Sequence, residues 1–279
     1  KHLKDTGVIL SLPLDGTELL ARVWKAEIRG VTGHTVPVFF LDTFHPENSE
    51  RHLNLGLTLY GGDDWVRIRQ EYLLGVGGVR LLEQMGYDVD GLHLNEGHCT
   101  FALLEMLGKG WSREELAKRV LFTTHTPVPA GHDRFQWGDV EEVLGELMPK
   151  DAKQLVIDAG DPENGERISM SHLAVALSGP VNAVSNLNAW VASSMFADHH
   201  IAPITNGVHH ITWTSPAMSE LFDTHLEGWK EDPTKLAHAG RIPTEDLAQS
   251  RDKARKVLRD LVKVGTGAVS YTHLRAHET

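Results

Sequence analysis

GLHLNEGH (Gly91–His98) is a short apolar run that ends in a polar, histidine-bearing turn, and two later stretches repeat the pattern: RVLFTTHTPVPAGHD (Arg119–Asp133) and APITNGVHHITW (Ala202–Trp213). Open α/β sheets bind ligands at the carboxyl ends of their strands. If the three runs are neighbouring strands, their turns converge on one pocket. That pocket would be rich in neutral hydrogen-bonding groups and poor in cations, which suits a polyhydroxylated ligand such as a sugar.

The rest of the chain alternates between strand-like and helix-like patterns. Residues 8–42 are predicted to form strands joined at turns, and the 65–86 pattern predicts a helix whose internal glycines indicate close packing or approach to a ligand. Strands alternating with helices predict a parallel sheet covered on both faces. Other expected strands are 90–95, 120–123 and 201–204, and other expected helices are 97–108, 111–120, 139–148, 150–158, a pair broken at Gly179 and Pro180, and 244–264.

The composition is that of an ordinary globular protein. The chain has 279 residues, of which 41% are hydrophobic and 23% charged, and no apolar stretch approaches the length of a membrane-spanning helix. The net charge of −11 argues against nucleic acid or anionic membranes as partners. A single cysteine, Cys99, excludes an intrachain disulfide, and a reducing cytoplasm is the simplest location.

Both ends of the chain are abrupt. It begins without an initiator methionine and ends VSYTHLRAHET (Val269–Thr279), which looks like the translation of a sequencing adapter. We therefore expect an internal fragment of a longer protein. Residues 1–264 are expected to form part of one domain, and residues 265–279 a non-native tail.

Six motifs occur in the order seen in one enzyme family: LDTFHPENSERHLNLGLTLYGGD, RIRQEYLLGVGG, HLNEGHCTFALLEML, FTTHTPVPAGHDRF, RISMSHLAVALSGPVNAVS and ITNGVHHITW. Over roughly residues 35–262 the chain resembles the α-glucan (glycogen/maltodextrin) phosphorylases, with greater similarity to the short bacterial branch. The resemblance implies an α/β fold, with a Rossmann-like parallel-sheet domain from the two-domain B-type glycosyltransferase architecture. In that architecture the active site lies between the two domains.

The resemblance also implies an activity. These enzymes reversibly transfer a terminal α-1,4-glucosyl unit from an α-glucan or maltooligosaccharide to phosphate, which gives glucose 1-phosphate. The implied cofactor is pyridoxal phosphate in the full-length protein, attached to a lysine outside this chain, so the fragment alone is expected to be inactive. A homo-oligomer is compatible with the resemblance, and no nucleic acid or membrane partner is expected.

Three matched residues would contact the reacting sugar. His125 matches the catalytic histidine whose main-chain carbonyl faces the anomeric carbon and whose ring contacts the 6-hydroxyl. Thr126 follows it in a sugar-contact position, and Asn206 matches an asparagine that holds the glucosyl ring. From the residues alone, His125 could equally be a turn or helix-capping histidine, and Asn206 before Gly207 a plain turn pair.

Three more matched residues would surround the entrance and the acceptor side. Asp63 matches the carboxylate of a mobile gating loop, and Glu96 and His98 match an acidic residue and a histidine on the acceptor side. Glu96 stands where mammalian members carry aspartate, and Asn188 where a histidine is expected. From the residues alone, Glu96 and His98 could simply cap a helix through its dipole, and Asp63 could be an ordinary loop residue.

Other chemistries have weaker support. His209 and His210 lack a third ligand at convincing spacing, so no metal is expected. The glycines at 75–78 are not preceded by a strand or followed by a lysine, which excludes a nucleotide-binding loop. Two alternatives remain: a sugar-nucleotide-dependent glucan synthase of the same architecture, and a non-catalytic carbohydrate-binding domain.

Overall fold

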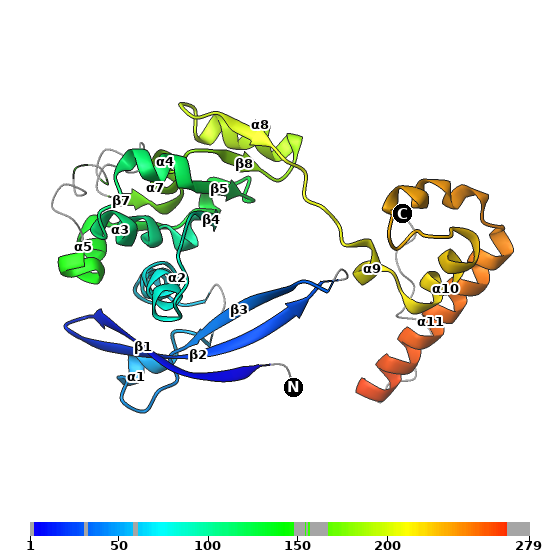
Figure 1. Ribbon diagram of the computed structural model, residues 1–279, viewed down its shortest axis with the longest axis horizontal. Coiled ribbons are helices and arrows are strands. Elements are labelled where there is room, and N and C mark those ends of the chain that lie inside the picture. Colours follow the sequence, from blue (N-terminus) through cyan, green and yellow to red (C-terminus); the bar gives the residue numbers. More distant parts are fainter. Residues whose placement is uncertain are drawn as a thin grey trace. The chain divides into compact units, whose positions relative to one another are not determined.

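The computed structural model describes residues 3–30, 33–57, 61–147, 154, 156 and 167–266 (Figure 1). The chain divides into two compact units, Lys1–Thr205 and Asn206–Thr279, each of which is described by itself. Of the expected tail at 265–279, residues 267–279 lie outside the described residues, as does most of the helix expected at 150–158.

An antiparallel sheet opens the first unit. Its strands are β1 (Lys4–Leu14), β2 (Thr17–Arg29) and β3 (Thr35–Asp42), in the order β1-β2-β3. Asp15 and Gly16 both have positive φ, 54° and 69°, as a two-residue turn between twisted antiparallel strands requires. The strands predicted over residues 8–42 are confirmed.

A parallel sheet of four strands forms the second layer of this unit. Its strands are β4 (Leu92–Asn95), β5 (Val120–Thr124), β8 (Val181–Ala183) and β9 (Ile201–Pro203), in the order β4-β5-β8-β9. All three pairings are parallel. The α/β fold class with a Rossmann-like parallel sheet is therefore confirmed, and the polar turns after β4 and β5 lie at the same edge.

Strand β8 is an element that the sequence reasoning missed. The 170–196 segment was expected to hold only two helices broken at Gly179 and Pro180, but Val181–Ala183 pairs with both β5 and β9. Three apolar residues are too short to show a strand period. Their conformation is fixed by the two neighbouring strands.

The helices and short segments of the first unit connect and cover these sheets. Ser112 and Glu115 form the predicted capping box at the start of α4. The helix expected at 97–108 begins as a 3₁₀ turn and continues as α3. The bounds are α1 (Glu50–Leu53), α2 (Asp64–Gln84), η1 (Gly97–Cys99), α3 (Phe101–Gly108), α4 (Arg113–Arg119), η2 (Pro129–Gly131), β6 (Arg134–Gln136), α5 (Trp137–Leu144), η3 (Gly145–Leu147), β7 (Arg167–Ser169), α7 (Met170–Leu177) and α8 (Asn186–Met195).

Helix α2 lies between the antiparallel sheet and α3 (Figure 1), and its glycines make this close approach feasible. A Cβ on Gly75 would lie 2.7 Å from the backbone nitrogen of Ala102, and one on Gly77 would lie 3.0 Å from Leu12 Cδ1. A Cβ on Gly78 would meet nothing within 4 Å. Two of the three glycines are therefore explained by packing.

The second unit is helical. Its small core consists of Leu221, Leu226, Trp229 and Ile242. Within the described residues, no helix of either unit combines the length and apolar character needed to cross a membrane. The helices are α9 (His210–Trp213), α10 (Pro216–His225), η4 (Pro233–Arg241) and α11 (Thr244–Thr266), of which the last confirms the amphipathic helix predicted at 244–264.

Candidate functional site

The turns that follow β4 and β5, two of the three that the sequence predicts to converge, come together. The third run contains β9, which β8 separates from β5. The side chain of Glu96 reaches from the first turn to the second, where its Oε1 accepts hydrogen bonds from the His125 backbone nitrogen at 2.6 Å and from Thr126 Oγ1 at 2.9 Å. Three residues predicted for the site thus form one hydrogen-bonded group at the carboxyl edge of the parallel sheet.

Glu96 has an unusual backbone conformation. Its φ of 64° and ψ of 179° lie in a region that only glycine adopts without strain, and the residue is 6% exposed. Such strain costs roughly 1–3 kcal/mol and persists only where surrounding contacts impose it. Its carboxylate and its backbone nitrogen, which donates to Thr123 O at 2.9 Å, supply those contacts.

Asn188 holds the same turn from the opposite side. Its Nδ2 donates to the main-chain oxygen of His125 at 3.1 Å, and its own backbone nitrogen donates to Ser185 Oγ at the start of α8. The departure noted in the sequence, asparagine where a histidine is expected, therefore falls on the carbonyl assigned to catalysis. A carbonyl oxygen has two lone pairs, so this contact leaves one acceptor position.

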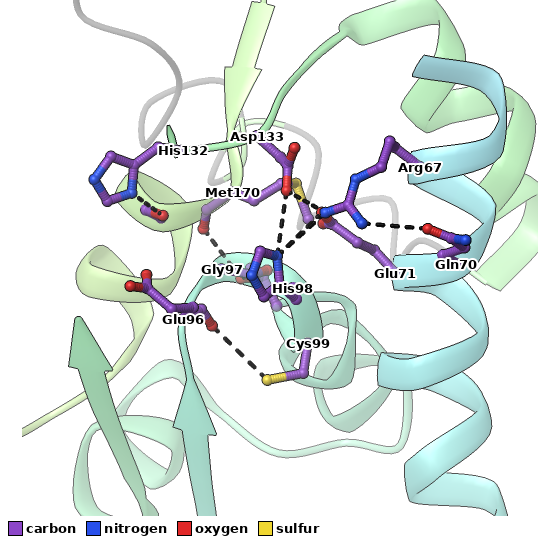
Figure 2. Close-up of polar contacts among 12 residues, drawn as sticks. Arg67, Gln70, Glu71, Glu96, Gly97, His98, Cys99, His132, Asp133 and Met170 are labelled. Carbon is purple, nitrogen blue, oxygen red and sulfur yellow. Dashed lines mark hydrogen bonds and ion pairs between the residues drawn. The ribbon is translucent and has the colours of Figure 1, made fainter. Parts of the chain in front are cut away.

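His98 belongs to a different network. Figure 2 shows its ring directed toward Asp133 and Arg67, whereas the Glu96 carboxylate points away from them. Asp133 Oδ2 lies 2.6 Å from Arg67 Nη2 and 3.2 Å from His98 Nδ1. Glu71 Oε1 lies 3.4 Å from Arg67 Nη2 and 3.8 Å from His98 Nδ1. Glu96 and His98 therefore take part in separate hydrogen-bonded networks, and their acceptor-side roles stay predictions.

The charges in this network are strongly perturbed. Burial raises the pKa of Glu71 to about 8, and the hydrogen bond to Asp133 raises the pKa of His98 to about 9. Burial opposes ionisation of Asp133, but hydrogen bonds from His98, Glu71 and Arg67 outweigh it and hold the pKa of that carboxyl well below its usual range. The directions of these pKa shifts favour a charged His98, a charged Asp133 and a protonated Glu71 at neutral pH.

The ligand atoms of Glu71, His98 and Asp133 all lie within 4.8 Å of one another, which is close enough to hold a metal ion. The guanidinium of Arg67 contacts all three, however, and so places a fixed positive charge where the ion would bind. A cation at that position would meet Coulomb repulsion in a largely buried setting. The absence of a metal stays a prediction.

Asp63 and Asn206 belong to other segments of the chain, the start of α2 and the start of the second unit. Asp63 caps α2, since its Oδ1 accepts from the backbone nitrogen of Val66 at 3.0 Å. It also lines an acidic pocket together with Asp64, Trp65, Arg69, Asp139 and Glu142. Asn206 is exposed and is the first residue of the second unit. The gating and sugar-contact roles of these two residues stay predictions.

The sequence reasoning did not single out several residues of these networks. Arg67 and Glu71 are four positions apart in RIRQEY, a spacing that places both on one face of a helix. Asp133 and His132 end the quoted HTPVPAGHD motif. Their presence in the quoted motifs was a signal that they belong to the site. Their hydrogen-bonding partners come from other elements, however, and could not be assigned from the sequence.

Comparison with known proteins gives the class of the chain. No family model matches it. Curated maltodextrin and glycogen phosphorylases match it over most of its length, and the chain is a homologue of one part of these α-glucan phosphorylases.

The particular relatives come from archaea and bacteria. The chain is 31% identical over 283 residues to the maltodextrin phosphorylase of Thermococcus litoralis, an alignment that covers 93% of the chain and 33% of that protein. It is 32% identical over 263 residues to the glycogen phosphorylase of Aquifex aeolicus, with 86% and 37% covered, and 31% identical over 238 residues to that of Mycobacterium tuberculosis, with 74% and 27% covered. The chain thus spans about a third of the length of these relatives.

Proposed function

We propose that the whole protein, of which this chain is a part, is an α-glucan phosphorylase that transfers a terminal α-1,4-glucosyl unit to phosphate and releases glucose 1-phosphate. The observation that carries the proposal is the similarity to phosphorylases at 31% identity across 93% of the chain. The grouping of Glu96, His125 and Thr126 at the carboxyl edge of the sheet supports it, because ligands of open α/β sheets bind at this edge.

The turn at His125 is suited to the expected chemistry. Glycosyl transfer passes through a state in which the anomeric carbon carries positive charge. The His125 carbonyl oxygen would face that carbon, with Asn188 fixing its direction, while Glu96 fixes the preceding peptide group through the His125 nitrogen. A dipole held in place before the reaction stabilises developing charge without reorganisation at the moment of transfer.

The other predicted residues complete the proposal. Thr126 and the His125 ring would contact the reacting sugar, and Asn206 would hold the glucosyl ring. His98, held by Asp133 and charged at neutral pH, would serve the acceptor side. Asp63, at the start of α2, would guard the entrance. A cytoplasmic location and a homo-oligomer complete the set of expectations.

Pyridoxal phosphate would supply a phosphate group beside the substrate phosphate. Attachment of this cofactor needs a lysine in an enclosed site. No lysine among the described residues is buried. This supports the proposal that the attachment lysine lies elsewhere in the whole protein.

The test uses the full-length enzyme with maltoheptaose and inorganic phosphate, and measures glucose 1-phosphate. We expect release that depends on phosphate, and no glucosyl transfer from UDP-glucose or ADP-glucose. Transfer from a sugar nucleotide without phosphorolysis would instead identify a glucan synthase. Binding of maltoheptaose without either reaction would identify a carbohydrate-binding domain. The 279-residue chain alone is expected to release no glucose 1-phosphate.

A further inference from the structure

His132 closes the loop that begins at His125. It is 8% exposed, its Nε2 lies 3.2 Å from the main-chain oxygen of Thr126, and its Nδ1 lies 2.8 Å from Ser171 Oγ in α7. A carbonyl oxygen can only accept, so Nε2 carries the ring hydrogen and donates it. Nδ1 then accepts from the hydroxyl of Ser171, which defines one neutral tautomer. Burial, with a smaller contribution from Arg134, lowers the pKa of this histidine against the opposing charges of Glu96 and Asp133.

The loop itself is built for this contact. A Cβ on Gly131, the residue before His132, would lie 2.4 Å from Thr126 Cγ2, so only glycine fits at this approach. The peptide group after Thr126 leads into Pro127, which has no backbone N–H. The Thr126 oxygen is therefore the hydrogen-bonding group through which a side chain can hold this peptide group.

Three successive peptide groups of the turn are each held by a side chain, two of them by residues from other segments and the third by His132 of the same loop. Glu96 binds the group before His125 through its nitrogen, and Asn188 binds the next group through the His125 oxygen. The group after that is bound by His132 through the Thr126 oxygen. We propose that His132 is a positioning residue for the glucosyl-transfer site, one of three anchors that fix the orientation of the His125 carbonyl; this rests on the proposed function.

The chain offers a matched control in His172. Its Nδ1 lies 2.9 Å from Ser169 Oγ and its Nε2 lies 3.2 Å from a main-chain oxygen, that of Met195. Both histidines pack edge-on against Phe196, with ring centroids 5.7 Å away for His132 and 4.8 Å away for His172. The two rings share the same kinds of partner, but the carbonyl bound by His172 belongs to the end of α8.

The first measurement is kinetic and uses the full-length enzyme. We expect His132→Ala to lower kcat by about 10- to 100-fold with a small change in KM for maltoheptaose, since misplacement of a catalytic group by about 1 Å can cost 100-fold. His172→Ala should stay within about threefold of the wild type. His132→Gln, whose amide nitrogen can reach the Thr126 oxygen, should recover much of the lost kcat.

The second measurement does not depend on activity. Hydrogen exchange of the 279-residue chain should show faster exchange of the His125 amide in His132→Ala than in the wild type, and no such change in His172→Ala. Equal kcat and equal exchange in the two alanine variants would overturn the inference. If the wild-type enzyme released no glucose 1-phosphate, the proposed function would fail, while the exchange data would still test whether His132 holds the turn.

Discussion

Replacement of Glu96 separates two opposing terms, the strain of its backbone and the hydrogen bonds of its carboxylate. Glu96→Ala keeps a side chain at φ 64° and removes both bonds to the following turn. Hydrogen bonds to a charged group contribute roughly 1.5–3 kcal/mol each, so the loss is about 3–6 kcal/mol. Glu96→Gly removes the same bonds but relieves roughly 1–3 kcal/mol of strain.

The glycine also gains entropy in the unfolded chain, which costs about 0.4–1 kcal/mol. Glu96→Gly should therefore be more stable than Glu96→Ala by up to about 2.6 kcal/mol, although less stable than the wild type. Glu96→Gln should lie closest to the wild type, because both bonds are accepted by the single atom Oε1, which an amide oxygen can replace. The expected order of the glycine and alanine variants is the reverse of the usual one, in which alanine is the more stabilising residue.

The assay is urea unfolding of the 279-residue chain followed by circular dichroism, with the three variants compared under one set of conditions. The order of the midpoints should be wild type, Gln, Gly, Ala. If the alanine variant is at least as stable as the glycine variant, the backbone of Glu96 is not strained. If all three variants match the wild type, the carboxylate does not hold the turn.

The remaining predictions concern the site and its support. In the full-length enzyme, His125→Ala should lower kcat and kcat/KM together, by factors that correspond to a loss of roughly 2–4 kcal/mol of transition-state stabilisation. A residual rate should remain because the main-chain carbonyl is still present, and wild-type turnover would exclude the catalytic role of His125. Gly75→Ala should destabilise by about 1–3 kcal/mol in urea unfolding through overpacking, whereas Gly78→Ala, with nothing within 4 Å, should stabilise α2 by up to about 1 kcal/mol. Glu71 keeps its proton in the folded state up to a pKa of about 8 but loses it near 4.5 when unfolded, so its contribution makes stability fall as pH rises through that window. Glu71→Gln should remove this fall, and unfolding midpoints measured from pH 5 to 6.5, below the range in which His98 also contributes a fall, would reveal it.

Local patterns in the sequence were enough to predict the layers of the fold. Turn residues such as Asp15 and Gly16 mark the hairpin, and the spacing of Ser112 and Glu115 marks a helix start, because both signals act within a few residues. Strand β8 carries no such signal. Its three residues are extended because β5 and β9 flank them, and the partners come from positions 122–124 and 201–203.

As with the fold, only part of the site could be predicted from the sequence. Parallel strands end at one edge, so the meeting of the turns that carry Glu96 and His125 followed from the pattern. The separation of His98 from Glu96 did not follow, although only one residue lies between them. The strained conformation of Glu96 directs its carboxylate toward the turn after β5, while His98 is the middle residue of the 3₁₀ turn Gly97–Cys99 and faces α2. Sequence proximity is a poor guide to shared function wherever the backbone takes such an uncommon conformation.

The departures from the family pattern belong to one structural device. Glu96 has one more methylene than the aspartate of mammalian members, and it uses its length to reach the backbone of the next turn. Asn188 stands in place of a histidine and binds the carbonyl that the same turn presents. His125 is bound by residues 29 and 63 positions away, so each anchor can be recognised only when the other is in view. If the two substitutions work together, restoring the family residue at one position alone should impair the turn more than restoring both. A double-mutant cycle of Glu96→Asp and Asn188→His, read by the exchange rate of the His125 amide, would measure that coupling directly, and strictly additive effects would show that the two anchors act independently.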